Sequence, residues 1–449
     1  MSYDRETRWG FTLERHARSE PVVIARSRQT VSEYIRLQQA VAAIASTAGV
    51  RKRGVQWFPH PFPARMPADV AVAAVTQLTD PDAVVLDPMC GSGVVPYCAR
   101  SLGRVAHGRD IDPLAVLLGR ALCASVTSTQ VREFCDKVLK DAQARAKVLK
   151  TPSRFVKELA KEDRQFLKYW FSKKAVLQLF CLAEAICACR PRTLATVGAA
   201  VFSSLIISRG AGASYAMDLS RSRPHKVDTK QPRKPFEIWP EKARAFALFY
   251  DTAKNSRSTS NIALGDARQM DFADASVDAV ITSPPYLNAI DYMRTSKYTL
   301  IFLGAKLEAL REIRATSIGA EVGLARGALP PALDERVARS VRESRRAGMV
   351  RRYLFDMQRV LAQTARVLRP GGVALYVLGP SIISRKTYDS VEIISWLAEL
   401  AGLRAIASAR RNLSSANRSL PPPNRGRRGK SLNRRMTCEY YLVLKKPEP

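Results

Sequence analysis

Short apolar runs recur in two separate parts of the chain, with helical stretches between them. The runs have the length and composition of buried strands and fall at residues 83–86, 104–108, 261–264, 277–282 and 372–378. Strands that alternate with helices pair in parallel within one open sheet. The pattern therefore predicts an α/β fold with a Rossmann-like, doubly wound sheet.

Further elements are predicted outside these runs. Residues 438–445 alternate well enough to form a last strand, and helical patterns cover 32–48 and 68–78. The longest apolar stretch, at 194–207, is shorter than the roughly 20 residues that a membrane-spanning helix needs. We therefore expect a buried helix there and no membrane partner.

The middle of the chain differs from both α/β parts, because long helical stretches rich in lysine and arginine replace the strands. This change divides the chain into an N-terminal extension at 1–50, a first α/β half at 51–123 and a mainly helical basic insertion at 124–260. A second α/β half follows at 261–449 and contains basic loops and the C-terminal strand. No internal repeat is evident.

The charge of the chain is strongly unbalanced. There are 72 lysines and arginines against 40 acidic residues, which gives a formal net charge of +32. Such an excess predicts a polyanionic partner, and nucleic acid is the first candidate. Solvated basic faces are the alternative source of part of this charge. The first residues lack the apolar core of a secretory signal, so we expect a cytoplasmic protein.

The cysteines do not predict a metal site. Eight are scattered along the chain, and the closest group is Cys181, Cys187 and Cys189. These three lack the paired spacing and the neighbouring histidines of a zinc site. Small apolar packing on a helix explains them, and no metal is predicted.

A glycine turn follows the first predicted strand, in the sequence from Asp87 to Gly93, and two acids, Asp110 and Asp112, follow the second strand. This is the nucleoside-binding layout of many α/β proteins, in which a carboxylate accepts both ribose hydroxyls. Val94 stands where a phosphate-binding loop has its lysine, and the dinucleotide spacing of glycines is missing. A cofactor without phosphates fits better.

Three motifs resemble those of one enzyme family. The sequence from Asp87 to Gly93 resembles the D-P-F-x-G-S-G motif of S-adenosylmethionine-dependent amino-methyltransferases, and 282–286 resembles the S-P-P-Y motif of DNA cytosine-N4 methyltransferases. Residues 58–67 look like the segment that clasps the cofactor in that family. The order of the motifs is also found there. The resemblance covers roughly a third of the chain, at 55–118, 261–304 and 364–380.

The resemblance implies S-adenosylmethionine as the cofactor and assigns roles to matching residues. Asp87 and the glycine turn would hold the methionine moiety, Asp110 the ribose and Asp266 the adenine, with Asp112 a weaker candidate for the ribose. Met89 and Cys90 depart from the common phenylalanine, and Val94 departs from the usual threonine. The full set of expected cofactor-binding residues is Phe58, Pro63, Asp87, Pro88, Gly91, Gly93, Asp110, Asp112 and Asp266.

The second motif also has a chemical logic. An exocyclic amine of a base is a poor nucleophile, so acceptors must hold its hydrogens while its lone pair turns toward the methyl group. The Ser283 hydroxyl and the Pro284 carbonyl can do this. Pro284 and Pro285 stiffen the loop, and Tyr286 offers a ring to an extruded base. Transfer would be direct, without a covalent enzyme intermediate.

Several basic residues are candidates for contacts with nucleic acid. Some lie in the loop at 220–226, and others follow the S-P-P-Y motif with mixed helical spacing. These residues are Arg221, Arg223, His225, Lys226, Arg294 and Lys297. A solvated basic surface is the alternative for each. The insertion at 124–260 is the candidate region for recognising the target.

The sequence thus favours a DNA methyltransferase acting on N4 of cytosine in double-stranded DNA, within a restriction-modification or epigenetic system. A cognate restriction endonuclease is the further partner that the resemblance implies. Adenine-N6 methylation of DNA is the nearest alternative. An RNA guanine-N2 methyltransferase comes next, since its cofactor motif often reads D-P-M-C-G-S-G, although D-P-P-Y and an N-terminal RNA-binding domain are typical there. The non-enzymatic alternative is a basic DNA-binding protein on an inactive methyltransferase fold.

Overall fold

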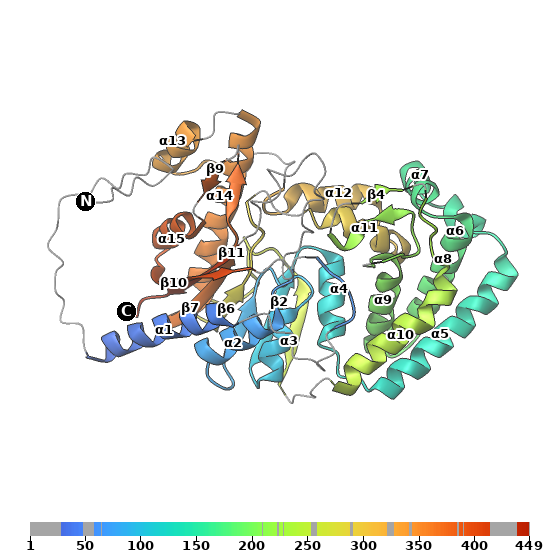
Figure 1. Cartoon of the computed structure of the whole chain (residues 1–449), viewed down its shortest axis with the longest axis horizontal. Coiled ribbons are helices and arrows are strands. Elements are labelled where there is room, and N and C mark those ends of the chain that lie inside the picture. Colours follow the sequence, from blue (N-terminus) through green and yellow to red (C-terminus); the bar gives the residue numbers. More distant parts are fainter. Residues whose placement is uncertain are drawn as a thin grey trace.

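The computed structural model describes most of the chain and shows two parts side by side, a sheet flanked by helices and a cluster of helices (Figure 1). The described residues are 28–47, 58–63, 65–208, 210–221, 224–227, 229–252, 258–287, 291–320, 327–340, 344–383, 386–388, 390–413 and 438–448. The expected contact residue Arg223 lies outside them.

Within the described residues, seven strands form one sheet in the order β10-β11-β7-β6-β1-β2-β5. The strands are β1 (Val84–Asp87), β2 (Val105–Asp110), β5 (Ser260–Leu264), β6 (Val277–Thr282), β7 (Leu368–Leu378), β10 (Arg404–Asn412) and β11 (Cys438–Lys445). Strands β5, β2, β1, β6 and β7 pair in parallel, and β11 runs antiparallel to β7 and β10. The predicted Rossmann-like, doubly wound α/β fold is confirmed.

Two strands of the sheet differ most from the prediction, and β2 ends at Asp110 rather than at 108. Strand β7 begins at Leu368 rather than at 372, because Leu368 pairs with Val277 before the register shifts and Val373 pairs with Ala279. The Pro-Gly-Gly sequence thus forms a bulge inside the strand instead of a turn before it. Strand β10 was not predicted, since its arginine-rich sequence lacks the apolar run of a buried strand and its position at the sheet edge does not require one.

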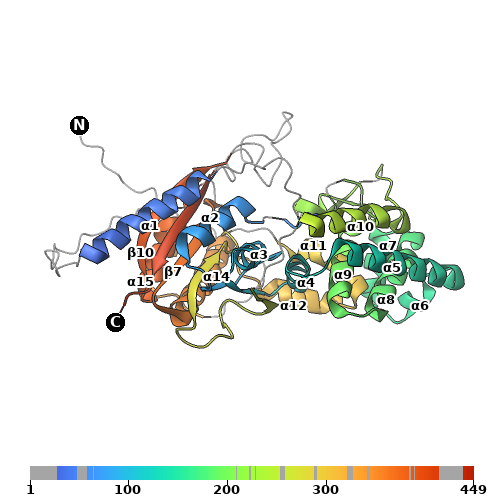
Figure 2. The same ribbon diagram turned by 90° about the horizontal axis from the view of Figure 1, so that it is seen from below.

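Helices cover both faces of the sheet (Figure 2). On one face, α1 (Arg28–Ser46), α2 (Ala68–Leu78) and α3 (Val94–Ser101) form a core with β1, β7 and β11. On the other face, α14 (Ser344–Val367) and α15 (Ser390–Leu400) pack on β6 and β7, with α13 (Pro331–Ser340) beside them. The short strands β8 (Ser381–Ile383) and β9 (Lys386–Tyr388) form a separate pair.

The helical part begins beyond α4 (Pro113–Leu122), at the β5 side of the sheet (Figures 1 and 2). Its elements are α5 (Ser128–Leu149), α6 (Ser153–Lys157), α7 (Lys161–Trp170), α8 (Lys173–Ala188), α9 (Arg192–Ile206), β3 (Ala216–Met217), η1 (Leu219–Arg221), β4 (His225–Lys226) and α10 (Pro235–Thr252). The apolar stretch at 194–207 is the buried helix α9.

Helices from a later part of the chain complete this helical core. α11 (Met293–Leu300), η2 (Ile301–Leu303) and α12 (Leu307–Thr316) share one hydrophobic cluster with α5, α8, α9 and α10. The helices just after the S-P-P-Y loop are therefore packed against the insertion rather than against the sheet. No helix among the described residues is long and apolar enough to cross a membrane.

Candidate active site

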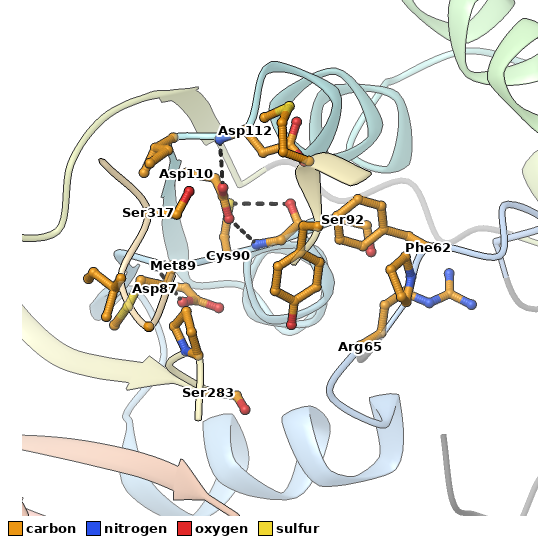
Figure 3. A pocket seen from close by; sticks show the side chains of 18 of the residues that line it. Phe62, Arg65, Asp87, Met89, Cys90, Ser92, Asp110, Asp112, Ser283 and Ser317 are labelled. Carbon is orange, nitrogen blue, oxygen red and sulfur yellow. Dashed lines mark hydrogen bonds between the residues drawn. The ribbon is translucent and has the colours of Figure 1, made fainter. Parts of the chain in front are cut away.

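A pocket lies at the carboxyl edge of the sheet, where parallel strands end and ligands bind in open α/β folds. Its wall combines the clasp segment, the glycine turn after β1, the end of β2, the S-P-P-Y loop after β6, the start of α11 and the segment after α12 (Figure 3). The fold thus brings together motifs that are about 190 residues apart in sequence.

The glycine turn leads from β1 into α3. Gly91 and Gly93 both have left-handed backbones, with φ of +50° and +83°. The turn is fixed by hydrogen bonds from the Cys90 amide to the Arg109 carbonyl at 2.9 Å and from the Gly93 amide to the Cys90 carbonyl at 2.8 Å. Val94 and Val95, in the first turn of α3, also line the pocket. Backbone amides at a helix start favour a negatively charged ligand group.

Gly93 also permits the close approach of two helices. A Cβ atom at Gly93 would lie 2.7 Å from the Gly119 Cα in α4. We therefore expect Gly93→Ala to lower the free energy of unfolding by more than the roughly 1–3 kcal/mol that a strained left-handed residue costs. Urea unfolding measures this. Gly103→Ala is the matched control, because Gly103 has the same φ of +83° but nothing within 4 Å of the position that a Cβ atom would take. Equal losses in both variants would contradict the steric argument.

Two acids follow β2 and have different surroundings. Asp110 accepts hydrogen bonds from the Gly91 amide at 2.8 Å and from the Asp112 amide at 2.9 Å. Asp112 is the N-cap of α4, accepting from the Leu114 amide at 2.9 Å, and its other oxygen accepts from the Ser296 hydroxyl at 2.5 Å. Both line the pocket. Asp110 keeps lone pairs for a ligand, whereas Asp112 is mainly structural.

Burial is the largest cause of the raised pKa values of three carboxyls in the pocket wall, those of Asp87, Asp110 and Asp112. It raises the pKa of Asp110, against hydrogen bonds from backbone amides that lower it. It raises the pKa of Asp112 to about 7, and the neighbouring Asp110 adds to this rise. Burial also raises the pKa of Asp87, again to about 7, although the hydroxyl of Thr282 lowers it. The acidic wall is therefore sensitive to pH near neutrality.

A hydrogen bond joins the two motifs directly. The Thr282 hydroxyl, at the end of β6, donates to Asp87 Oδ1 at the end of β1 over 2.7 Å, and both residues are buried. The Met89 amide also donates to Asp87 at 3.2 Å. Asp87 therefore fixes the position of the S-P-P-Y loop relative to the glycine turn. Threonine directly before the motif was the available sequence signal for this role.

The four residues of the S-P-P-Y motif are divided between the pocket and its support. Ser283 and Pro285 line the pocket, and the Ser283 hydroxyl donates to the Val377 carbonyl at 3.3 Å. Pro284 is buried. The ring of Tyr286 lies against Gly379, where a Cβ atom would come within 2.5 Å of it. Neither Pro284 nor Tyr286 is among the lining residues.

The clasp segment contributes different residues than expected. Pro63 lines the pocket, but Phe58 packs in the helical core against Phe246 and Phe249, with ring centroids 5.2 and 5.4 Å apart. Phe62 takes the pocket position instead and stacks on Tyr292, with centroids 5.9 Å apart and planes 9° from parallel. Neither Phe62 nor Tyr292 was expected to line the pocket, although their aromatic character was an available signal in the sequence.

Asp266 lies outside the pocket lining. Its two oxygens accept hydrogen bonds from Arg268, at 2.6 to 3.1 Å, and Arg268 also donates to Asp356 at 2.8 Å and to the Thr316 carbonyl at 2.8 Å. The Arg268 side chain is only 3% exposed. Ser317, which follows Thr316, begins the last segment of the pocket wall, so the ion cluster around the buried Arg268 holds that wall in place.

The predicted basic contact residues lie around α11. Arg294 lines the pocket and bonds to Asp291, and the Lys297 ammonium lies 5.2 Å from the centre of the Phe166 ring. The Thr295 hydroxyl donates to the Leu219 carbonyl, which places η1 and Arg221 beside α11. Burial lowers the pKa of Lys297.

The β3–β4 hairpin carries the other two basic residues. His225 and Lys226 are exposed, and the Lys226 ammonium lies 5.0 Å from the Tyr169 ring and 5.5 Å from the Tyr215 ring. Its stem and charge are therefore held over an aromatic surface. Within the part of the chain that the structure describes, no group of three histidine, cysteine or acidic residues could hold a metal ion.

No protein-family model matches the chain. Among curated proteins, the chain is 22% identical over 416 residues to Type II methyltransferase M.MvaI of Kocuria varians, a match spanning 86% of this chain and 90% of that protein. Over 49 residues it is 45% identical to Type II methyltransferase M.BsoBI of Geobacillus stearothermophilus, which spans 11% of this chain and 10% of that protein.

Solved structures are less similar to this chain in sequence than these two curated proteins are. A SAM-dependent methyltransferase from Methanosarcina mazei is 9% identical, with a TM-score of 0.30, over 84% of this chain and 97% of that one. A candidate DNA modification methylase from Thermus thermophilus, solved with S-adenosyl-L-methionine, is 19% identical, with a TM-score of 0.21. That match spans 41% of this chain and 54% of the other.

Proposed function

We propose that this protein is an S-adenosylmethionine-dependent DNA methyltransferase that methylates the exocyclic N4 amine of cytosine. One observation carries the proposal: a single pocket is lined both by the glycine turn with Asp110 and by Ser283 of the S-P-P-Y loop. A cofactor site and an amine-holding loop that share one pocket fit group transfer between two bound molecules. The broad likeness to a Type II methyltransferase supports the same activity.

The pocket suits a nucleoside cofactor without phosphates. Asp110 would hold the ribose, the amides at the start of α3 would hold the methionine carboxylate, and Phe62 with Pro63 would cover the bound molecule. When bound, S-adenosylmethionine supplies a methyl group activated by a sulfonium. The adenine role inferred for Asp266 would be indirect, through Arg268 and the wall at 317–320.

Ser283 and the Pro284 carbonyl would hold the two hydrogens of the target amine, so that its lone pair faces the methyl group. Thr282 and Asp87 keep this loop in place next to the glycine turn. Serine at the first position of the motif favours cytosine N4. Adenine N6 remains the second target, because the same loop geometry serves either amine.

DNA is the proposed substrate on the basis of charge and position. The net charge is +32, and Arg294, at the pocket, is followed along α11 by Lys297. Arg221, His225 and Lys226 would extend this track over the helical part, which we propose as the region that recognises the target. The likeness to a Type II methyltransferase supports a role in a restriction-modification system with a cognate endonuclease as partner, and an epigenetic role is the alternative.

The proposal is tested by offering the purified protein S-adenosylmethionine with a tritiated methyl group. Mixed-sequence duplex DNA and total RNA are supplied in separate reactions, and label retained on each polymer is counted. We expect label on DNA alone. Label on RNA alone would support guanine-N2 methylation. Calorimetric titration with the cofactor runs in parallel, and absence of cofactor binding would support the inactive DNA-binding alternative.

Arg268→Lys provides a test of the pocket wall. Lysine retains the charge but cannot bond to Asp266, Asp356 and the Thr316 carbonyl in one plane. We expect the KM for S-adenosylmethionine to rise about tenfold, the effect of one lost hydrogen bond to a charged group, with little change in kcat. Arg366→Lys is the matched control, because Arg366 makes a similar set of bonds near the start of β6. An equal rise in both variants would contradict the assigned role.

A further inference from the structure

Two arginines lie where the pocket opens to solvent. Arg294, in α11, and Arg314, in the last turn of α12, both line the pocket, and their side chains are 41% and 34% exposed. Side chains that line a pocket and also remain partly exposed lie at its mouth. The mouth is therefore positively charged, whereas the acids Asp87, Asp110 and Asp112 form part of the wall.

One carboxylate holds the two guanidinium groups together. The Nε atoms of Arg294 and Arg314 both donate to Asp291 Oδ2, the first at 3.0 Å, and the Arg294 amide donates to Asp291 Oδ1 at 3.3 Å. Asp291 also lines the pocket, and its side chain is only 18% exposed. The two guanidinium groups share a single negative charge, so one positive charge is left without a counterion in this group of three residues.

Arg314 keeps hydrogen-bond donors for a ligand. Its Nε atom bonds to Asp291, and no further hydrogen bond of its side chain is found within the part of the chain that the structure describes. A guanidinium carries five N–H groups in one plane, so its terminal nitrogens can hold two oxygens of one anion. Because the bond to Asp291 already fixes that plane, little side-chain freedom is lost when an anion binds. The group fits a phosphate or a carboxylate.

The position at the mouth favours a phosphate of DNA over the methionine carboxylate of the cofactor. In the proposed function, that carboxylate is held by the backbone amides at the start of α3. A base extruded from duplex DNA stays joined to a phosphate on each side, so a phosphate comes to the mouth of the pocket that receives the base. α11 continues from Arg294 to Lys297 and is bonded through Thr295 to η1, which extends the basic surface away from the pocket.

We propose that Arg314 and Arg294 bind the phosphate next to the extruded cytosine, and that Asp291 is the positioning residue that sets the two guanidinium groups. The assignment rests on the proposed function, because it takes the pocket as the place that receives the base. A contact to the backbone positions the target strand without reading its sequence. Since Ser283 and Arg294 line the same pocket, this contact would hold the nucleotide over the S-P-P-Y loop.

The salt dependence of DNA binding by Arg314→Gln tests the phosphate site. Fluorescence anisotropy measures binding to a short labelled duplex with one mispaired cytosine, because a mispaired base is extruded at lower cost. Each phosphate contact contributes about 0.9 to the slope of log Kd against log salt concentration, and we expect the slope to fall by about this amount. The affinity should fall about tenfold, as for one lost hydrogen bond to a charged group. Arg314→Lys keeps the charge and should retain the slope.

Arg132→Gln is the matched control for this variant. Arg132 also forms an ion pair with one aspartate, Asp251, at 3.1 Å, and both side chains are exposed. Asp251 lies at the end of α10, which leads to the beginning of β5, so this pair is near the edge of the sheet opposite the pocket. Arg132→Gln should keep the wild-type slope. An unchanged slope in Arg314→Gln, or an equal fall in both variants, would overturn the phosphate site.

The affinity for the cofactor separates the two anions. Calorimetric titration of Arg314→Gln with S-adenosylmethionine, without DNA, should give the wild-type dissociation constant. A weaker cofactor affinity together with an unchanged salt slope would show that the guanidinium groups hold the methionine carboxylate, and would overturn the phosphate site. If Arg314→Gln does not fold, Arg294→Gln decides by the same two measurements. Absence of methyl transfer by the wild-type protein would instead refute the proposed function, and the salt slope would still decide whether the arginines bind a phosphate.

Discussion

Replacing Ser283 with alanine is expected to reduce methyl transfer about 100- to 1,000-fold, the loss caused by removing one preorganised polar group from a transition state. The hydroxyl would hold one hydrogen of the target amine. Because Ser283 lies apart from Asp110 and Asp112 in the pocket, the affinity for S-adenosylmethionine should stay the same (Figure 3). Single-turnover kinetics with labelled cofactor and calorimetry measure the two quantities.

Ser276→Ala is the matched control for this variant. Ser276 directly precedes β6, at the end opposite Ser283, and its hydroxyl is bonded only locally, to the Ala273 carbonyl at 2.7 Å. This variant should keep the wild-type rate. Full methylation by Ser283→Ala would show that Ser283 has no catalytic role.

Asp110→Ala is expected to weaken S-adenosylmethionine binding about 100-fold, because two charge-assisted hydrogen bonds to the ribose would be lost at ~1.5 kcal/mol or more each. The substitution also releases the Gly91 and Asp112 amides, which Asp110 holds at the turn. Calorimetric titration gives the dissociation constant. Asp110→Asn, which keeps one acceptor oxygen, should lie between the wild type and Asp110→Ala.

Asp80→Asn controls for loss of charge near the same strands. Asp80 is exposed in the loop before β1, on the opposite side of the sheet from the pocket. The affinity of the Asp80→Asn variant for S-adenosylmethionine should equal that of the wild type. If Asp110→Ala bound S-adenosylmethionine as tightly as the wild type, the proposed ribose site would be wrong.

The apolar runs in the sequence were enough to predict the sheet and the position of the pocket at its carboxyl edge. The apolar runs that end in Asp87 and Thr282 become adjacent parallel strands, so the motifs after them meet as expected. This step needs only strand polarity and the rule that parallel strands share a carboxyl edge. The helix at Ala68–Leu78 and the strand at Cys438–Lys445 were also predicted, since their periodicity is strong.

Tertiary packing decided what could not be predicted. Phe58 and Phe62 have the same side chain four residues apart, yet one packs in the helical core and the other lines the pocket. The positions of α10 and α11 decide that Phe58 packs in the helical core and that Phe62 lines the pocket. Similarly, the role of Asp266 depends on Arg268, whose other partners, Asp356 and Thr316, lie far along the chain.

The pattern of charged residues predicted less of the structure than the apolar pattern did. The arginine-rich sequence of β10 reads as a basic surface, but Arg411 is buried beside Tyr441 and Glu439. The basic residues after the S-P-P-Y loop belong to α11, whose apolar positions join the helical core. A link between the catalytic loop and the proposed target-recognising helices therefore became visible only in the fold.

The identity of the methylated base decides between the proposed reaction and its alternatives. The protein is incubated with S-adenosylmethionine carrying a deuterated methyl group and with duplex DNA of mixed sequence, and the DNA is digested to nucleosides for mass spectrometry. We expect the label in N4-methylcytosine. Label in N6-methyladenine would contradict the assigned base, and label in 5-methylcytosine would contradict the amine-transfer chemistry of the S-P-P-Y loop.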